Sequence, residues 1–288
     1  MSRWLNDDTV AVLTKRGYAE WVSDIGSIVD GLLGRFHLTA IAPLEGGTMS
    51  AVIHCKTQEG TDVVLKASPN TSELKLERQF LARVPLSTPR ILDATTEALV
   101  LEFLSGAPER GQLPDGVAVT ALAKMQLWSR EEPGVLLDVD DMLEVIVTRL
   151  SVRDVALAKT LTGYGPVIRE RWGEPAVWCH GDLQGENVFW DGESLRAIDP
   201  LPVWAPQGMD IGYWAADPLR GSLPARRLEL LSSAFAMPFE EIVAWVTLGA
   251  AQHVSWLWHY DVGPDLSARA ESSLRSLLRL HTGTPKYS

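Results

Sequence analysis

The stretch His180-Gly181-Asp182-Leu183-Gln184-Gly185-Glu186-Asn187 decides the fold, because it places three polar functional groups in one loop after the apolar run 176–179. Strand-like residues with an Asp-Gly turn among them fill 188–198, and Asp199 follows directly. This order predicts a hairpin that carries Asn187 at the start of one arm and Asp199 at the end of the other. The hairpin would bring two oxygen-bearing side chains face to face.

These side chains suit phosphoryl transfer, which requires magnesium on the nucleotide phosphates and an acceptor hydroxyl aimed at the γ-phosphorus. Asn187 and Asp199 supply the hard oxygen ligands that Mg²⁺ prefers. Asp182 is placed to accept the proton of the hydroxyl or to orient it, and we expect His180 to brace the loop by hydrogen bonding. A solvated acidic loop beside a hairpin is the alternative for this segment taken alone.

The pattern His-x-Asp-x4-Asn, a short hairpin and then Ile-Asp resembles the catalytic and metal-binding segment of protein kinases. Its His-Gly-Asp form is typical of aminoglycoside phosphotransferases and their small-molecule kinase relatives. The run 197–200, Ala-Ile-Asp-Pro, is similar to the streptomycin and hydroxyurea phosphotransferase branch. The resemblance spans 44–213 in order and extends weakly to Asp261. It implies a two-lobed, protein-kinase-like α+β fold that uses ATP and Mg²⁺, with ATP between the lobes.

Upstream, Val63-Val64-Leu65-Lys66 resembles the strand whose lysine meets the α- and β-phosphates. Glu77 is similar to the glutamate that pairs with this lysine, but Glu73 lies one turn away and competes for the role. We favour Glu77 because the family's glutamate usually precedes a Phe/Leu pair, here 80–81.

Two further segments match the family's nucleotide-binding parts. The segment 44–50 occupies the place of the phosphate-covering loop, although it departs from Gly-x-Gly-x-x-Gly, and its candidates for phosphate contact are Gly46, Gly47, Thr48 and Ser50. The segment 99–104 resembles the strand that enters the hinge, where adenine would bind the backbone of Glu102, Phe103 and Leu104.

Acceptor contacts are expected from the C-terminal part of the chain. The segment 256–261 is similar to a Trp-and-acid segment of the streptomycin branch, and it supplies Trp256 and Asp261 as candidates, with Asp265 close behind. Asp210 is a further candidate. The resemblance implies that an aspartate at its position steadies the catalytic loop, and a helix N-cap explains it equally well.

The hydrophobic pattern predicts a small N-terminal lobe followed by a mainly helical C-terminal lobe. Three strands at 36–44, 51–57 and 61–67 and two more near 91–92 and 99–101 give a five-stranded antiparallel sheet with one crossing helix, 72–84, behind one or two short helices in 7–33. Six helices are expected beyond it, at 117–129, 139–150, 155–172, 224–235, 239–260 and 266–280. We divide the chain into a nucleotide-binding lobe, 1–104, and a catalytic and acceptor-binding lobe, 105–288.

Composition limits the partners. The 288 residues carry 37 acidic and 26 basic side chains, a formal charge of -11, which disfavours nucleic acid and anionic membranes. A cationic small-molecule substrate is favoured weakly, since acidity for solubility explains the charge as well. Cys55 and Cys179 form no disulfide framework or zinc pattern. The N-terminus shows no secretory signal, and the apolar run 243–258 reads as a buried helix, so we expect a cytoplasmic monomer.

The sequence therefore predicts a small-molecule kinase whose acceptor is an aminoglycoside of the streptomycin type. A kinase for choline, homoserine, a sugar or a macrolide remains open, as does a nucleotide-binding scaffold without turnover. Retention of Lys66, Asp182, Asn187 and Asp199 favours an active enzyme. The choice between ATP and GTP is not decided by these residues.

Overall fold

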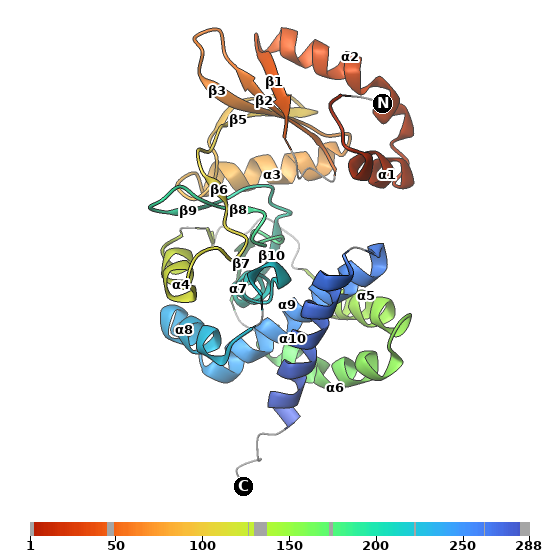
Figure 1. The fold of residues 1–288 in the computed structure, drawn as a ribbon, viewed down its shortest axis with the longest axis vertical. Helices are drawn as coiled ribbons and strands as arrows, with labels where there is room; N and C mark the ends of the chain where they lie inside the picture. Colours follow the sequence, from red (N-terminus) through yellow and green to blue (C-terminus); the bar gives the residue numbers. More distant parts are fainter. Residues whose placement is uncertain are drawn as a thin grey trace. The chain divides into compact units, whose positions relative to one another are not determined.

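The computed structural model describes residues 3–44, 49–125, 127–129, 137–172, 175–221, 223–261 and 263–282. The chain divides into two compact units, residues 1–105 and 106–288. Figure 1 shows the first unit as a sheet with helices and the second as mainly helical.

The first unit is built on a five-stranded antiparallel sheet with the strand order β1-β2-β3-β5-β4. Its strands are β1 (Thr39–Pro43), β2 (Ala51–Lys56), β3 (Asp62–Ala67), β4 (Ile91–Ala94) and β5 (Ala98–Glu102). Its helices are α1 (Asp7–Lys15), α2 (Ala19–Arg35) and α3 (Thr71–Arg83). The predicted helical region before the sheet is thus two helices, and Gly17, with a φ of 91°, lies in the turn between them.

Each face of this sheet is covered by a different helix, as Figure 1 shows for α2 and α3. Leu65 of β3 belongs to the hydrophobic cluster that includes Val29 of α2. Val64 packs instead against the cluster that contains Leu74 of α3. Because side chains alternate along a strand, Lys66 shares the α3 face with Val64. The register of β3 therefore aims the lysine at α3.

The second unit is mainly helical, with two small sheets of order β6-β8-β9 and β10-β7. Its helices are α4 (Asp115–Lys124), α5 (Val139–Ser151), α6 (Val155–Trp172), α7 (Gly208–Ala215), the 3-10 turn η1 (Pro218–Arg220), α8 (Ala225–Phe235), α9 (Phe239–Tyr260) and α10 (Pro264–Thr282). Its strands are β6 (Ala107–Pro108), β7 (Ala176–Cys179), β8 (Val188–Trp190), β9 (Leu195–Ala197) and β10 (Val203–Pro206). The predicted α+β class, with a five-stranded sheet and a helical remainder, is confirmed.

One predicted helix is too long. The helix expected over 117–129 ends at Lys124, and Ser129 forms a bridge with Trp178 of β7. The apolar residues that follow α4 resemble a continued helix in sequence, but Met125 already has extended backbone and Ser129 pairs with a strand of the second unit.

Helix α9 forms the centre of the second unit and packs closely against α7. A Cβ at Gly212 of α7 would overlap the backbone carbonyl of Trp245, and a Cβ at Gly249 of α9 would overlap the carbonyl of Gly212. Only glycine permits this approach of the two backbones. Since α7 also carries Asp210, the crossing helps to fix the position of that carboxylate, which accepts the backbone N–H groups of His180 and Gly181. The buried helix predicted over 243–258 lies within α9, most of which is buried.

Among the described residues, no single helix is long and apolar enough to cross a membrane. By length and composition alone, α8 and α9 pass that test as a pair, with a bend of 116° between them.

Candidate active site

Asp210 anchors the loop that follows β7, residues 180–187. Its carboxylate accepts the backbone N–H of His180 at 2.6 Å and of Gly181 at 2.9 Å, and it accepts the indole N–H of Trp128 at 3.1 Å. Asp210 has no exposed surface, and burial raises its pKa to about 6, although these three donors oppose the rise. A charge at this depth is tolerated because it is satisfied by several donors.

This geometry corrects two expectations for Asp210. It is the third residue of α7, whose N-cap is Gln207, so Asp210 is not a helix N-cap. A fully buried carboxylate engaged by the loop also has no surface to offer an acceptor. Of the roles considered, steadying the loop is the one that these contacts fit.

His180 and Gly181 give the loop its sharp turn. Gly181 has a φ of 78°, and a Cβ there would overlap the carbonyl oxygen of Leu201. The His180 ring lies 2.9 Å from the carbonyl oxygen of Ile198 through Nε2, and its Nδ1 accepts the backbone N–H of Asp182 at 3.3 Å. These two bonds are consistent with one neutral tautomer, protonated at Nε2. Because His180 is buried and both nitrogens are engaged, it holds the loop.

Asp182, the predicted base, lies beside Asn187 at the other end of the loop. The Asn187 side-chain amide donates to Oδ2 of Asp182 at 2.8 Å and to its backbone carbonyl at 3.0 Å. Burial, and then the negative charge of Asp199, raise the pKa of Asp182 to about 7, while hydrogen bonds from Asn187 and Tyr213 oppose the rise. A carboxyl group that titrates near neutrality can accept a proton at the working pH of most enzymes.

The predicted metal ligands, Asn187 and Asp199, lie at the two ends of the β8–β9 hairpin. The backbone N–H of Ile198 donates to the Asn187 carbonyl at 2.8 Å, so Asp199 comes one residue after the pairing. Asp199 has a φ of 55°, a conformation uncommon for a residue other than glycine. The hairpin and its register are local, and the Asp-Gly turn at 191–192 predicted them.

These residues fit magnesium. The Asn187 NH₂ group donates to Asp182, so its amide oxygen is the atom left to bind a cation. Asp199 adds a carboxylate, whose negative charge contributes to the raised pKa of Asp182. In the part of the chain that the structure describes, no group of three or more His, Cys, Asp or Glu could hold a metal. Magnesium requires no such cage, because it is bound by one or two side chains together with substrate phosphates and water.

In the first unit, Lys66 pairs with Glu77. The ammonium Nζ lies 2.8 Å from Oε1 and 2.7 Å from Oε2, and the two side chains are buried. Glu73 lies in the first turn of α3, where its backbone N–H donates to the N-cap Asn70 at 3.2 Å. The choice left open between the two glutamates is thereby decided for Glu77.

The structure describes only some of the other residues that we expect to contact the nucleotide. Gly46, Gly47 and Thr48 lie outside the described residues, whereas Ser50 is buried just before β2. The backbone N–H of Glu102 donates to the Arg90 carbonyl at 2.9 Å, and therefore it is not available to adenine. The Phe103 ring stacks on His54 at 4.4 Å between ring centroids, and Leu104 follows it outside any helix or strand. The bond between Glu102 and Arg90 excludes the Glu102 N–H as an adenine donor, and adenine binding by Phe103 and Leu104 stays a prediction.

The predicted acceptor residues gather around the end of α9. Trp256 is partly exposed and its ring lies 5.1 Å from that of Tyr260. Asp261 caps α9 in a left-handed conformation, is largely exposed, and accepts from Arg153 at 2.5 Å. Asp265 is exposed in the first turn of α10. These side chains are accessible to a ligand, unlike Asp210.

Helix α9 also connects this region to the loop. The His253 ring, one turn before Trp256, stacks on Tyr213 at 4.1 Å and bonds to its carbonyl oxygen at 2.9 Å. The Tyr213 hydroxyl in turn contributes a hydrogen bond to Asp182. Contacts through His253 and Tyr213 therefore connect the C-terminal part of α9 to the Asp182 carboxylate.

Sequence reasoning missed three side chains that support the loop: Tyr213 and Asp217 contact it directly, and Trp128 donates to its anchor, Asp210. Trp128 was assigned to a helix that does not extend so far. Tyr213 lies at the end of the matched segment 44–213, and the resemblance gives it no role. Asp217 precedes Pro218, a pattern that marks the start of a helical turn but carries no sign of a contact with a loop more than thirty residues away in sequence.

Comparisons with known proteins bear on the fold and the class of the chain, and no protein-family model matches the sequence. The chain is 26% identical over 291 residues to streptomycin 6-kinase from Streptomyces glaucescens, with 91% of each chain covered. Choline kinase LicA from Streptococcus pneumoniae has a similar fold, with a TM-score of 0.66, 12% identity, and 89% of this chain and 99% of that chain covered. A thermostable mutant of an aminoglycoside phosphotransferase, solved as a ternary complex with ADP and hygromycin B, gives a TM-score of 0.60, 15% identity and coverage of 88% and 99%.

The fold and the loop define the class first: the chain has the protein-kinase-like fold of small-molecule phosphotransferases. The relationship to streptomycin 6-kinase then confirms the predicted resemblance to the aminoglycoside phosphotransferases. In sequence and fold the chain is a small-molecule kinase.

Proposed function

We propose that this protein is an ATP- and Mg²⁺-dependent phosphotransferase that moves the γ-phosphoryl group to a hydroxyl of a streptomycin-like aminoglycoside. The observation that carries the proposal is the environment of the Asp182 carboxylate and the pKa that results from it. Its carboxylate is held by Asn187, lies under the charge of Asp199, and has a pKa raised to about 7. A carboxylate so placed can accept a proton from an alcohol near neutral pH.

The nucleotide-binding roles rest on charge. The buried Lys66–Glu77 pair supplies an ammonium group whose orientation is fixed by both carboxylate oxygens, which suits it to contact the α- and β-phosphates. We assign phosphate contacts also to Gly46, Gly47, Thr48 and Ser50, and nucleotide binding to the unit that carries them. The ADP bound to the related phosphotransferase supports a nucleotide of this kind.

The second unit would supply the catalytic and metal-binding groups. Asn187 and Asp199 would hold Mg²⁺, which neutralises the charge that develops on the phosphates. Asp182 takes the proton of the acceptor hydroxyl and orients its oxygen. Asn187 fixes the Asp182 carboxylate through its amide, and His180 and Asp210 fix the backbone on which Asp182 sits.

A cationic acceptor is supported by three observations. The relative at 26% identity is a streptomycin 6-kinase, and the whole chain has a charge of -11. Asp261 and Asp265 also expose carboxylates near the end of α9. Opposite charges attract a cationic sugar and orient it as it approaches.

Choline is a second candidate, favoured by one specific observation. The Trp256 and Tyr260 rings lie together at the same helix end, and aromatic faces bind quaternary ammonium groups. The choline kinase fold match is compatible with this alternative but shows the fold alone.

The test measures ADP release by the purified protein with ATP and Mg²⁺ against streptomycin, hygromycin B, choline and a neutral sugar, with the phosphorylated product identified by mass spectrometry. We expect turnover with streptomycin and its loss by orders of magnitude in Asp182→Asn. Glu186→Gln is the matched control, because Glu186 is exposed in the same loop. Transfer to choline alone would overturn the acceptor, and full turnover in Asp182→Asn would overturn the role of Asp182.

A further inference from the structure

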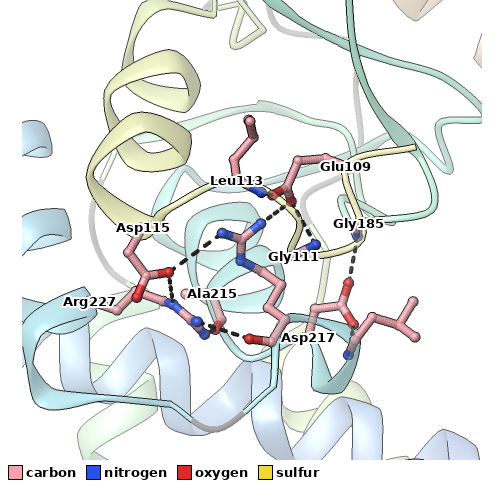
Figure 2. Close-up of polar contacts among 10 residues, drawn as sticks. Glu109, Gly111, Leu113, Asp115, Gly185, Ala215, Asp217 and Arg227 are labelled. Atoms are coloured by element: carbon pink, nitrogen blue, oxygen red, sulfur yellow. Dashed lines mark hydrogen bonds and ion pairs between the residues drawn. The ribbon is translucent and has the colours of Figure 1, made fainter. Parts of the chain in front are cut away.

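A cluster of five charged side chains lies beneath the catalytic loop in the second unit: Glu109, Asp115, Asp217, Arg220 and Arg227 (Figure 2). Arg220 pairs with Glu109, and both side chains are almost completely buried. Arg227 donates to Asp115 at 2.7 Å. Charges at this depth are costly unless they are paired and hydrogen-bonded, so the cluster must hold a defined geometry.

The cluster reaches the loop at one residue, Gly185. Oδ2 of Asp217 accepts the Gly185 backbone N–H at 2.5 Å, and the backbone N–H of Arg110 donates to the Gly185 carbonyl at 3.2 Å. Both polar atoms of this residue are thus fixed. Gly185 lies between Asp182 and Asn187 in the chain, so it sets the course of the backbone from one to the other.

Asp217 is itself held rigidly. Its Oδ1 accepts the backbone N–H of Leu219 at 2.8 Å, which caps η1, and Arg220 follows within the same turn. The Arg220 guanidinium lies over the Trp214 ring at 3.9 Å, so the turn is fixed at both its ends. A carboxylate with both oxygens committed to backbone donors positions its partner and is not free to move toward a ligand.

Glu109 orders the other side of Gly185. Its carboxylate accepts the backbone N–H of Gly111 and of Leu113, each at 3.2 Å, which wraps the segment around it. Its own N–H donates to the Val188 carbonyl at 2.7 Å, and this places Arg110 beside the loop. The Arg220–Glu109 pair therefore connects the two groups that hold Gly185.

We propose that Asp217 is a positioning residue for phosphoryl transfer, which acts through the Gly185 peptide to keep Asp182 and Asn187 at their working separation. This inference rests on the proposed function of the loop. The Arg220–Glu109 pair supports it by fixing both the turn that carries Asp217 and the segment that carries Arg110. Asp115 contributes to the stability of the cluster without contacting the loop.

The test compares Asp217→Asn with Asp115→Asn. In Asp217→Asn an NH₂ group replaces one of two acceptors, so one of the two backbone N–H groups loses its partner. We expect kcat to fall about 10- to 100-fold with little change in the KM for ATP, as for other residues that orient a catalytic group. Asp115→Asn should lower Tm and leave kcat per folded enzyme near wild type.

A second readout does not require activity. Hydrogen exchange of the amides of Gly185 and Leu219 should be slow in the wild type and in Asp115→Asn, and at least one of the two should be fast in Asp217→Asn. If Asp217→Asn fails to fold, Gly185→Ala replaces it. A Cβ there would lie 3.0 Å from Oδ2 of Asp217 and 3.1 Å from the Arg110 backbone, so it should separate the same contacts.

The positioning role would be overturned by unchanged kcat in a variant whose Gly185 amide has become fast-exchanging, by unchanged protection of both the Gly185 and the Leu219 amides in Asp217→Asn, or by an equal loss of kcat in Asp115→Asn. A wild-type protein without phosphotransfer activity would overturn the proposed function instead. In that case the exchange rate of Gly185 would still decide whether Asp217 holds the loop.

Discussion

Nζ of Lys66 lies within 2.8 Å of both carboxylate oxygens of Glu77, and these two side chains are 8% and 6% exposed. The pair joins the strand β3 to the helix α3 through a buried ammonium–carboxylate contact. Removing one partner of such a pair leaves an uncompensated buried charge, whereas replacing both can be nearly neutral.

Glu77→Gln should therefore lower the free energy of unfolding by about 3 to 5 kcal/mol and raise the KM for ATP. Glu73→Gln, on the same helix, is the control and should change both quantities little. In the double variant Lys66→Met, Glu77→Leu, we expect denaturant unfolding to show recovered stability while phosphotransfer stays absent. Recovery of activity in that variant would contradict the phosphate-binding role of Lys66.

Activity should depend on the protonation of Asp182. With a pKa raised to about 7, its carboxylate becomes protonated as the pH falls, so kcat/KM should decrease below about pH 7 and level off above it. In Asp182→Asn only a low residual rate should remain, and that rate should not decrease as the pH falls below about 7. A pH profile that is the same in both proteins would exclude Asp182 as the titrating group.

The same pKa predicts a change in stability of known sign. Because the folded-state pKa is above the ordinary value of an aspartate, the folded protein favours the protonated carboxyl group. Its contribution to stability is present below the unfolded-state pKa and is lost as the pH rises through about 7. Asp182→Asn, which mimics the neutral form, should raise Tm more at pH 8 than at pH 5, as thermal unfolding at the two pH values would show.

Asp210→Asn tests the anchor of the loop. An amide offers one acceptor where the carboxylate offers two, so either the His180 or the Gly181 backbone N–H would lose its partner in a fully buried site. We expect kcat to fall about 10- to 100-fold and Tm to fall as well. Trp128→Phe removes one 3.1 Å bond to the same carboxylate and should have a smaller effect on kcat. An equal effect of the two variants would argue against the backbone bonds as the anchor.

The acceptor assignment predicts opposite effects for two neighbours, Asp261 and Arg153. Asp261→Asn keeps a residue that tolerates the left-handed helix cap but removes the charge, so the KM for streptomycin should rise several-fold while the KM for ATP stays unchanged. Arg153→Met frees the carboxylate and should lower the KM for streptomycin. In the wild type this KM should rise with salt, because exposed charges are screened. Salt-independent kinetics would argue against a charge-guided acceptor.

Local sequence predicted much of the fold because its signals act over short distances. The 3.6-residue apolar period located α9 at 239–260, as observed, and the Asp-Gly turn located the β8–β9 hairpin. The helix expected to reach Ser129 was wrong at its end, since a bridge to Trp178 is a long-range contact that local propensity does not encode.

The sequence by itself determined the order of the candidate functional groups: a lysine on a strand, an aspartate and an asparagine in one loop, and an aspartate after the hairpin. Tertiary structure alone decided which residues support them. Glu73 and Glu77 lie one turn apart on α3, and only the register of β3 against α3 selected Glu77. Helix α7 packs against α9 through Gly212 and Gly249. This packing helps to position Asp210 in α7 and Asp217 just after it, and both carboxylates accept backbone N–H groups of the loop. Such choices depend on how whole elements pack, and that is a property of the folded chain rather than of any short segment.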